Sequence, residues 1–134
     1  MPGYGCVHKE DIMISKELLS LVLDKKVQSF DPNIVFDEND IRGHSYLMVV
    51  LEDETDQYGI SVAYVTDHVG RLCKEWCIKQ KYAVTSGITL SVIADTRYEC
   101  VVTQNKIHRE YSPYSELEAI IKAIEWVANK KGLI

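Results

Sequence analysis

The sequence predicts an α+β fold, in which helices pack on one face of an antiparallel sheet of about four to five strands. Two stretches, residues 66–81 and 115–131, show apolar side chains at helical spacing behind good capping residues. The apolar runs typical of strands come in neighbouring pairs joined by short polar segments, as in hairpins. The expected order is helix, two or three strands, helix, two strands, helix, which lacks the regular alternation of a parallel sheet.

Length and composition indicate one soluble domain over residues 1–134, with residues 1–12 as an N-terminal extension. The chain is 46% hydrophobic and 26% charged, which is ordinary for a globular protein. No apolar run approaches the ~20 residues that a membrane span needs. The first residues lack the pattern of a signal peptide, so a cytoplasmic location with reduced cysteines is expected.

The net charge of −5 is unevenly distributed. Residues 1–65 hold 5 Lys/Arg against 12 Asp/Glu, a net of −7, and residues 66–134 hold 10 against 8, a net of +2. The sequence contains no stripe of basic residues that could follow a phosphate backbone, which disfavours binding to nucleic acid. The acidic half could meet a basic partner, although solubility and ordinary loops explain it more simply.

The first half of the chain predicts a helix, a broken strand and a hairpin. Ser15 is a good N-cap, and the helix should end near residues 24–26. Residues 27–36 suit a bent or short edge strand, because Asp31-Pro32-Asn33 is a turn sequence. A polar loop at residues 37–40 follows. Residues 45–51 (SYLMVVL) and 58–65 then form the two strands of a hairpin.

The second half predicts two further helices around a second hairpin. Thr66 is placed to cap a helix whose apolar stripe includes Cys73, Trp76 and Cys77. Residues 82–87 are expected to be an exit loop. Strands are expected at residues 88–94 and 98–103, on either side of Asp95-Thr96-Arg97. Residues 105–113 read as polar and turn-like, although Ile107 and Tyr111 could extend the pairing a little. The last helix starts with the capping box of Ser115 and Glu118 and ends at Gly132.

Three short pieces of the chain resemble a group of small uncharacterised phage and prophage proteins. The pieces are ISKELLSLVL, HVGRLCKEWCIKQKY and SELEAIIKAIEWVANKKG, and they touch about half of the chain. The corresponding elements of the group read like "hKCKEWA" and "EPEAIFKACEWI". At residues 66–70 the chain departs from the group, which has a Tyr-Glu-Leu-Ala-like lead-in. The resemblance implies a phage-encoded setting and no catalytic residues.

Two constellations could carry thiol or metal chemistry, and a simpler structural role is favoured for both. Cys73 and Cys77, one helical turn apart, could bind Zn²⁺ together with Cys6 and His8, but they also lie on the stripe that must be buried. Cys100 could pair with a histidine, His108 or His44, as a nucleophile. Its position in an apolar strand is more typical of a packed thiol. We therefore expect no catalytic residues, no metal and no cofactor.

The acidic loop at residues 37–40 superficially resembles a calcium loop. It fails as an EF-hand because Gly43 is one place late and Met48 stands where the closing Glu should be. The chain contains no phosphate-binding loop, dinucleotide fingerprint, zincin motif or nucleophile elbow.

Aromatic and cationic residues around the start of the last helix are the best candidates for function. Exposed Tyr, Trp and Arg are common anchors of protein interfaces and of small-ligand pockets. The candidate binding residues are Tyr111, Tyr114, Trp126, Arg109 and His108. The function expected from the sequence is a non-enzymatic phage- or prophage-type binding protein that recognises a host protein or sequesters a small ligand. Assembly into a homo-oligomer is compatible with it. The alternative is a small hydrolytic or thiol-dependent enzyme whose Cys and His residues converge in the fold.

Overall fold

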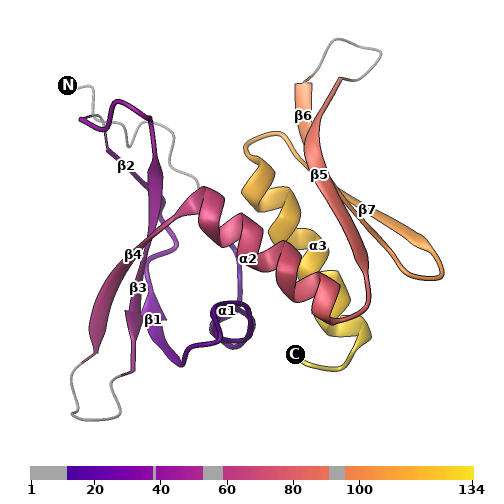
Figure 1. Cartoon of the computed structure of the whole chain (residues 1–134), viewed down its shortest axis with the longest axis horizontal. Coiled ribbons are helices and arrows are strands. Elements are labelled where there is room, and N and C mark those ends of the chain that lie inside the picture. Colours follow the sequence, from indigo (N-terminus) through magenta and orange to yellow (C-terminus); the bar gives the residue numbers. More distant parts are fainter. Residues whose placement is uncertain (1–11, 38, 53–58, 91–95) are drawn as a thin grey trace. The chain divides into compact units, whose positions relative to one another are not determined.

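A computed structural model describes residues 12–37, 39–52, 59–90 and 96–134 (Figure 1). The described residues form three helices and two antiparallel sheets, of four and three strands, so the predicted α+β class is confirmed. The strands lie in two sheets instead of the single sheet that was expected. The chain divides into two compact units, residues 1–69 and 70–134. No helix among the described residues is long and apolar enough to cross a membrane.

The first unit begins with helix α1 (Lys16–Leu23). The hydroxyl of Ser15 accepts a hydrogen bond of 3.1 Å from the backbone N–H of Leu18, which confirms the predicted N-cap. The helix ends at Asp24, whose backbone is left-handed. The buried side of α1 contacts strand β1 (Val27–Phe30) and consists of Leu18, Leu19, Val22 and Leu23.

Strand β3 (Ser45–Leu51) is the centre of the first sheet. It pairs with β4 (Ile60–Val65) along one edge and with β1 and β2 (Val35–Phe36) along the other. The predicted break between β1 and β2 is confirmed, because the side chain of Asp31 accepts the N–H of Asn33 in a tight turn. Buried Leu47 and Val49 alternate with partly exposed neighbours, which gives β3 a buried and an exposed side.

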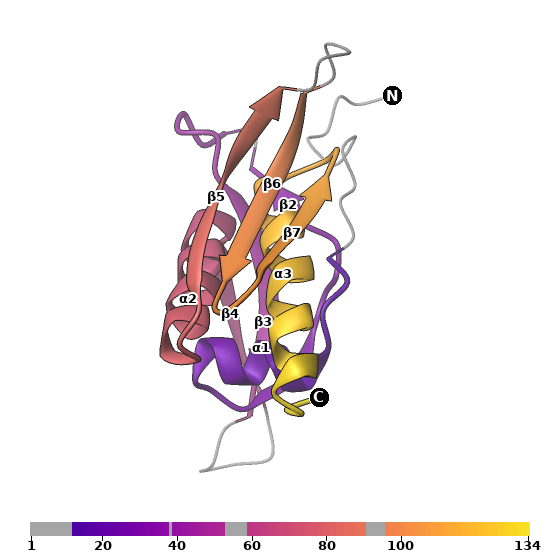
Figure 2. The ribbon, with the colours of Figure 1, turned by 90° about the vertical axis from the view of Figure 1, so that its right-hand side faces the viewer.

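The second unit contains a three-stranded sheet with helix α3 (Glu116–Lys130) on one face (Figure 2). Its strands are β5 (Ala83–Leu90), β6 (Thr96–Thr103) and β7 (Ile107–Ser112), with β6 in the middle. Helix α2 (Thr66–Lys79) begins in the first unit and continues into the second. Ser115 accepts the N–H of Glu118 at 3.1 Å, which confirms the predicted cap of α3.

Two stretches of the second sheet differ from the sequence prediction. Residues 83–87 belong to β5 instead of an exit loop, and residues 107–112 form β7 instead of a turn. For β7 the reason is that apolar and polar residues have exchanged their usual sides. Its exposed side holds Ile107 and Tyr111, while polar Ser112 is fully buried. Of the expected strand at residues 88–94, residues 91–94 lie outside the described part of the chain.

Candidate functional site

The three described thiols, Cys73, Cys77 and Cys100, are all buried. Burial raises the pKa of each thiol, and it raises the pKa of Cys77 and of Cys100 to about 12. A thiol in this state is a poor nucleophile, because nucleophilic attack needs the thiolate. Cys6 and His8 lie outside the described residues. Within the described ranges, no group of three or more His, Cys, Asp or Glu side chains could hold a metal ion.

The face of the second sheet opposite α3 carries two of the predicted binding residues, Arg109 and Tyr111. We call this surface the outer face and define it by Arg97, Glu99, Val101, Ile107, Arg109 and Tyr111. The guanidinium carbon of Arg97 lies 5.4 Å from the centre of the Tyr111 ring. The Nη1 atom of Arg109 lies 3.5 Å from Glu99 Oε2 on the neighbouring strand. The cation–π contact and the ion pair therefore link four side chains in two pairs across β6 and β7.

The other two candidates on β7 and α3, His108 and Trp126, contact each other instead. Their rings stack in parallel, with centres 4.1 Å apart and planes inclined by 6°. Nε2 of His108 lies 2.5 Å from the carboxylate of Glu110, which is on the same side of β7. The ring of Tyr82 meets Trp126 edge-on at 6.1 Å. These contacts use the flat surfaces of His108 and Trp126 inside the unit, so they support a packing role.

Next to this cluster, Glu125 is partly buried in α3. Burial raises the pKa of its carboxyl group, and the nearby carboxylate of Glu110 adds to this shift. The ionised form of Glu125 is therefore disfavoured by its surroundings, and this carboxylate is a small source of instability at neutral pH.

Tyr114 lies in the turn between β7 and α3, apart from the other candidates. The buried hydroxyl of Ser112 accepts hydrogen bonds from the N–H groups of Tyr114 (3.0 Å) and Ser115 (3.3 Å). The turn is thereby held, while the Tyr114 side chain is 69% exposed. The five predicted residues thus fall into an outer-face pair, a packed pair and an isolated tyrosine. Neighbouring residues of a strand point to opposite faces, which separates His108 from Arg109.

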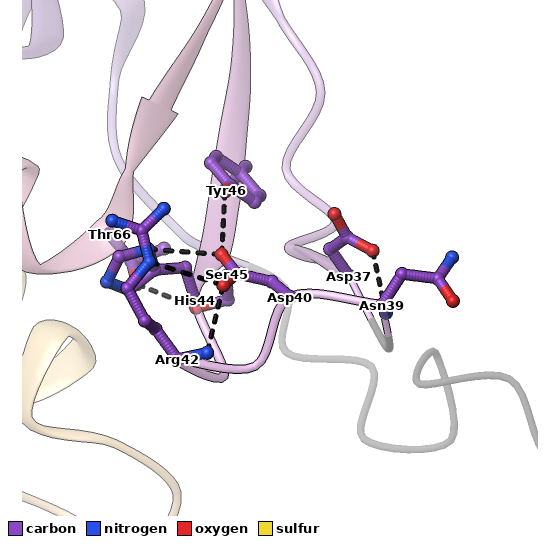
Figure 3. A network of polar contacts seen from close by, with 8 residues as sticks. All are labelled: Asp37, Asn39, Asp40, Arg42, His44, Ser45, Tyr46 and Thr66. Atoms are coloured by element: carbon purple, nitrogen blue, oxygen red, sulfur yellow. Dashed lines mark hydrogen bonds and ion pairs between the residues drawn. The ribbon is translucent and has the colours of Figure 1, made fainter.

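A polar network in the first unit was not singled out from the sequence (Figure 3). It centres on Asp40 in the loop between β2 and β3. One carboxylate oxygen of Asp40 accepts the N–H of Arg42 at 2.9 Å, and the other accepts the hydroxyl of Tyr46 at 3.1 Å. The N–H of Arg42 is the main cause that lowers the pKa of Asp40, and Tyr46 adds to it, although burial opposes the shift.

Further contacts extend this network to the start of α2. The Nδ1 atom of His44 lies 3.2 Å from Asp40 Oδ2, but it is not aligned for a hydrogen bond with it. The hydroxyl of Ser45 lies 2.7 Å from that of Thr66, the first residue of α2 (Figure 3). The network therefore connects the described residues of this loop through their polar groups, while the side chain of Ile41 stays fully exposed. Only the polar character of this loop was visible in the sequence.

A pocket of about 280 Å³ lies on the first sheet, where β1, β3 and β4 meet. Met48 and Val50 contribute apolar surface, and Ser29, Asp31 and Ser61 contribute polar groups. Its volume is below the roughly 300–1,000 Å³ that is usual for small-molecule sites. The pocket is therefore a weaker candidate than the outer face of the second sheet.

Comparison of the chain with protein-family models, curated proteins and solved structures found no match.

Proposed function

We propose that this chain is a non-enzymatic binding protein that recognises a partner protein through the outer face of the second sheet. The observation that carries the proposal is the fixed arrangement of Arg97, Arg109 and Tyr111 on a sheet face that no described helix covers. A phage or prophage setting, with a host protein as the partner, rests on the resemblance of three sequence pieces alone.

The residue types on the outer face favour a protein partner. Tyrosine and arginine are enriched among the residues that dominate binding energy in protein interfaces. Ile107 adds an exposed apolar side chain at the end of the same strand. The cation–π contact and the ion pair hold the long side chains before any partner arrives. Less side-chain freedom is then lost on binding, which favours affinity.

The charge of the outer face suggests the chemistry of the partner. Two arginines stand against the single carboxylate of Glu99, so the face is locally positive in a chain whose net charge is −5. A partner surface with a carboxylate near an apolar group would complement Arg109 and Ile107. Such a partner would also be attracted to this face in preference to the acidic first half of the chain.

The alternative of a thiol-dependent enzyme gains no support from the three described thiols. Each is buried, and its raised pKa keeps it protonated at neutral pH. Cys100 faces the same side of the second sheet as His108, yet its pairing partner across the strands is Glu110. A hydrolytic reaction based on this histidine would have to break its contact with Glu110 and its stacking on Trp126.

The test is a binding measurement with a partner captured from the host and then purified. We expect Tyr111→Ala to raise the Kd at least about tenfold, as loss of an interface anchor does. Arg109→Ala should weaken binding and lower its dependence on salt. The matched control is Tyr114→Ala, which removes an equally large, more exposed ring outside the face and should leave the Kd unchanged.

Two results would contradict the proposal. One is wild-type affinity of both Tyr111→Ala and Arg109→Ala, with folding verified by circular dichroism. The other is a larger loss from Tyr114→Ala than from Tyr111→Ala, which would move the binding site to the turn before α3.

A further inference from the structure

Strand β4 lies at an edge of the first sheet. In the part of the chain that the structure describes, it pairs with β3 alone, and its six residues run in continuous register from Ile60↔Leu51 to Val65↔Tyr46. An edge strand presents unpaired N–H and C=O groups along its open side. Such a row is a template for pairing with another strand, and natural proteins normally protect it.

The opposite edge of the same sheet shows these protective features. The register of β1 shifts between Val27 and Ser29, which is a β-bulge, and Pro32 follows the strand. Strand β2 is only two residues long. Strand β4 has none of these devices: its sequence, ISVAYV, contains no charge and no proline, and its register has no shift. The two edges of this sheet are therefore built for different surroundings.

We propose that β4 pairs with β4 of a second copy of this chain, antiparallel and about a two-fold axis at Val62. In this register Ile60 lies opposite Tyr64 of the other copy, and Ser61 lies opposite Ala63. Val62 meets its own equivalent on the axis. The two first sheets then continue into one another, and the pairing of β4 with β3 is unchanged.

The sequence of β4 is suited to pairing with itself. Residues directly opposite each other must point to the same face, and Ile60, Val62 and Tyr64 share one face while Ser61 and Ala63 share the other. The register places a β-branched side chain beside an aromatic ring at both ends, which is a favourable cross-strand pair. Ile60, 52% exposed in the single chain, would gain this neighbour.

Charge also favours a second copy as the occupant of this edge. Each chain carries a net charge of −5, so two copies repel each other over most orientations. The β4 edge is a neutral strip, where two like-charged chains can meet without placing charges opposite each other. A two-fold axis uses the same strip twice, which is the usual form of a homodimer contact.

Strand β5 is the competing edge, because it also lacks charge and proline. Its side chains are less suited to pairing, since Ser86 on the α3 side donates its hydroxyl to Glu116 at 2.6 Å and Gly87 on the other side offers no side chain to a cross-strand pair. Its exposed Ala83 and Thr85 match Ala63 and Ser61 in spacing and exposure. They provide a control for the experiment.

The experiment is a charge-swap series measured by sedimentation over a range of concentrations. Ser61→Lys with Ala63→Lys places lysines opposite each other twice, so we expect the Kd of the dimer to rise about tenfold or more. Ser61→Asp with Ala63→Asp should do the same. An equal mixture of the two double variants should restore a dimer, because each lysine then faces an aspartate. The control, Ala83→Lys with Thr85→Lys on β5, should dimerise like the wild type.

Ser61 and Ala63 are exposed, so these variants are expected to fold, which circular dichroism verifies. A single chain with Ser61→Asp and Ala63→Lys is complementary to itself and should remain a dimer. The proposal is overturned if the wild type stays monomeric at the highest concentration. It is also overturned if the lysine pair on β4 leaves the dimer intact, if the mixture fails to restore it, or if the β5 control dissociates. The variants on β4 leave the outer face of the second sheet unchanged, so their outcomes do not depend on the proposed partner site, whereas the β5 control places its lysines on that face.

Discussion

The two sheets differ in the charge of their exposed surfaces. On the second sheet, the outer face holds charged side chains that are already paired with one another, as Arg109 is with Glu99. On the first sheet, β4 has no charge, and Met48 and Val50 of β3 stay partly exposed on its unburied side. The comparison separates two kinds of recognition. Charged side chains favour specific binding of one partner, and an uncharged edge strand favours pairing with a second copy of the same chain.

The same contrast appears in the carboxylates of the two units. Asp40 in the first unit accepts hydrogen bonds that lower its pKa, whereas burial and Glu110 raise the pKa of Glu125 in the second. One ionised carboxylate therefore stabilises its unit, and the other destabilises it. The contributions of Asp40 and Glu125 to stability therefore change in opposite directions as the pH falls.

The largest expected effect tests the buried side of α2 in the second unit. Trp76 is buried, and Trp76→Ala should lower the free energy of unfolding by about 3–5 kcal/mol, as truncation of a large core aromatic does. Urea denaturation measures the change. On the same helix Ile78 is 58% exposed, so Ile78→Ala should change stability far less. An unchanged midpoint for Trp76→Ala would show that the buried face of α2 is misassigned.

The next effect compares glycines in the two units. A Cβ atom at Gly59, next to β4, would overlap the side chains of Val50 and Gln28 and come within 3.1 Å of the carbonyl oxygen of Leu51. Gln28 can move, but Val50 is branched at Cβ and stiff. Gly59→Ala should therefore cost about 1–3 kcal/mol of stability.

Gly87 of β5 is the matched control, because a Cβ atom there meets nothing within 4 Å. Gly87→Ala should be neutral or should stabilise by up to about 1 kcal/mol, since alanine restricts the unfolded chain. Equal losses from the two substitutions in a urea titration would contradict the close packing at Gly59.

A smaller effect concerns pH and the first unit. Because the folded pKa of Asp40 is below its ordinary value of 3.8, its contribution to stability is present above that value and is lost as the pH falls through the folded pKa. The stability advantage of the wild type over Asp40→Asn should therefore be full at neutral pH and shrink under acid. Thermal unfolding at a series of pH values measures it. A difference that grows under acid would contradict the assignment.

The smallest effect concerns the second unit and has the opposite sign. The folded pKa of Glu125 is raised above 4.5, so its ionisation costs stability as the pH rises through the unfolded and folded values. Glu125→Gln should thus be slightly more stable than the wild type at neutral pH, and this gain should vanish in acid. The same thermal series measures it. A loss of stability at neutral pH would show that the carboxylate has a favourable partner.

The local signals in the sequence were sufficient for helices and for apolar strands. Ser15 and Ser115 cap α1 and α3 as predicted, and the bounds of β3 are those expected from its apolar run. Capping depends on neighbours three residues away, so it can be read from sequence. β7 could not be predicted in this way, because its side chains do not show the apolar alternation of a strand. Its buried residue Ser112 is polar, and its hydroxyl forms hydrogen bonds with the backbone of the turn that follows.

The candidate site was predicted only in part, because its geometry depends on β7. Once residues 107–112 form a strand, alternation sends Arg109 and Tyr111 to one face and His108 to the other. Arg97 and Glu99 come from the neighbouring strand, so their contacts need the register of β6 with β7. The contact between Asp40 and Tyr46 likewise needs the fold of the loop, and the spacing of the residues does not encode it.

The position of β3 has a consequence for how the first unit forms. Every described strand of the first sheet pairs with β3, and β1, β2 and β4 do not pair with one another. No part of this sheet can therefore assemble before β3 takes its place, and the hairpin of β3 with β4 offers the closest contacts in sequence. Substitutions that weaken β3 should therefore affect the pairing of all three of its neighbours.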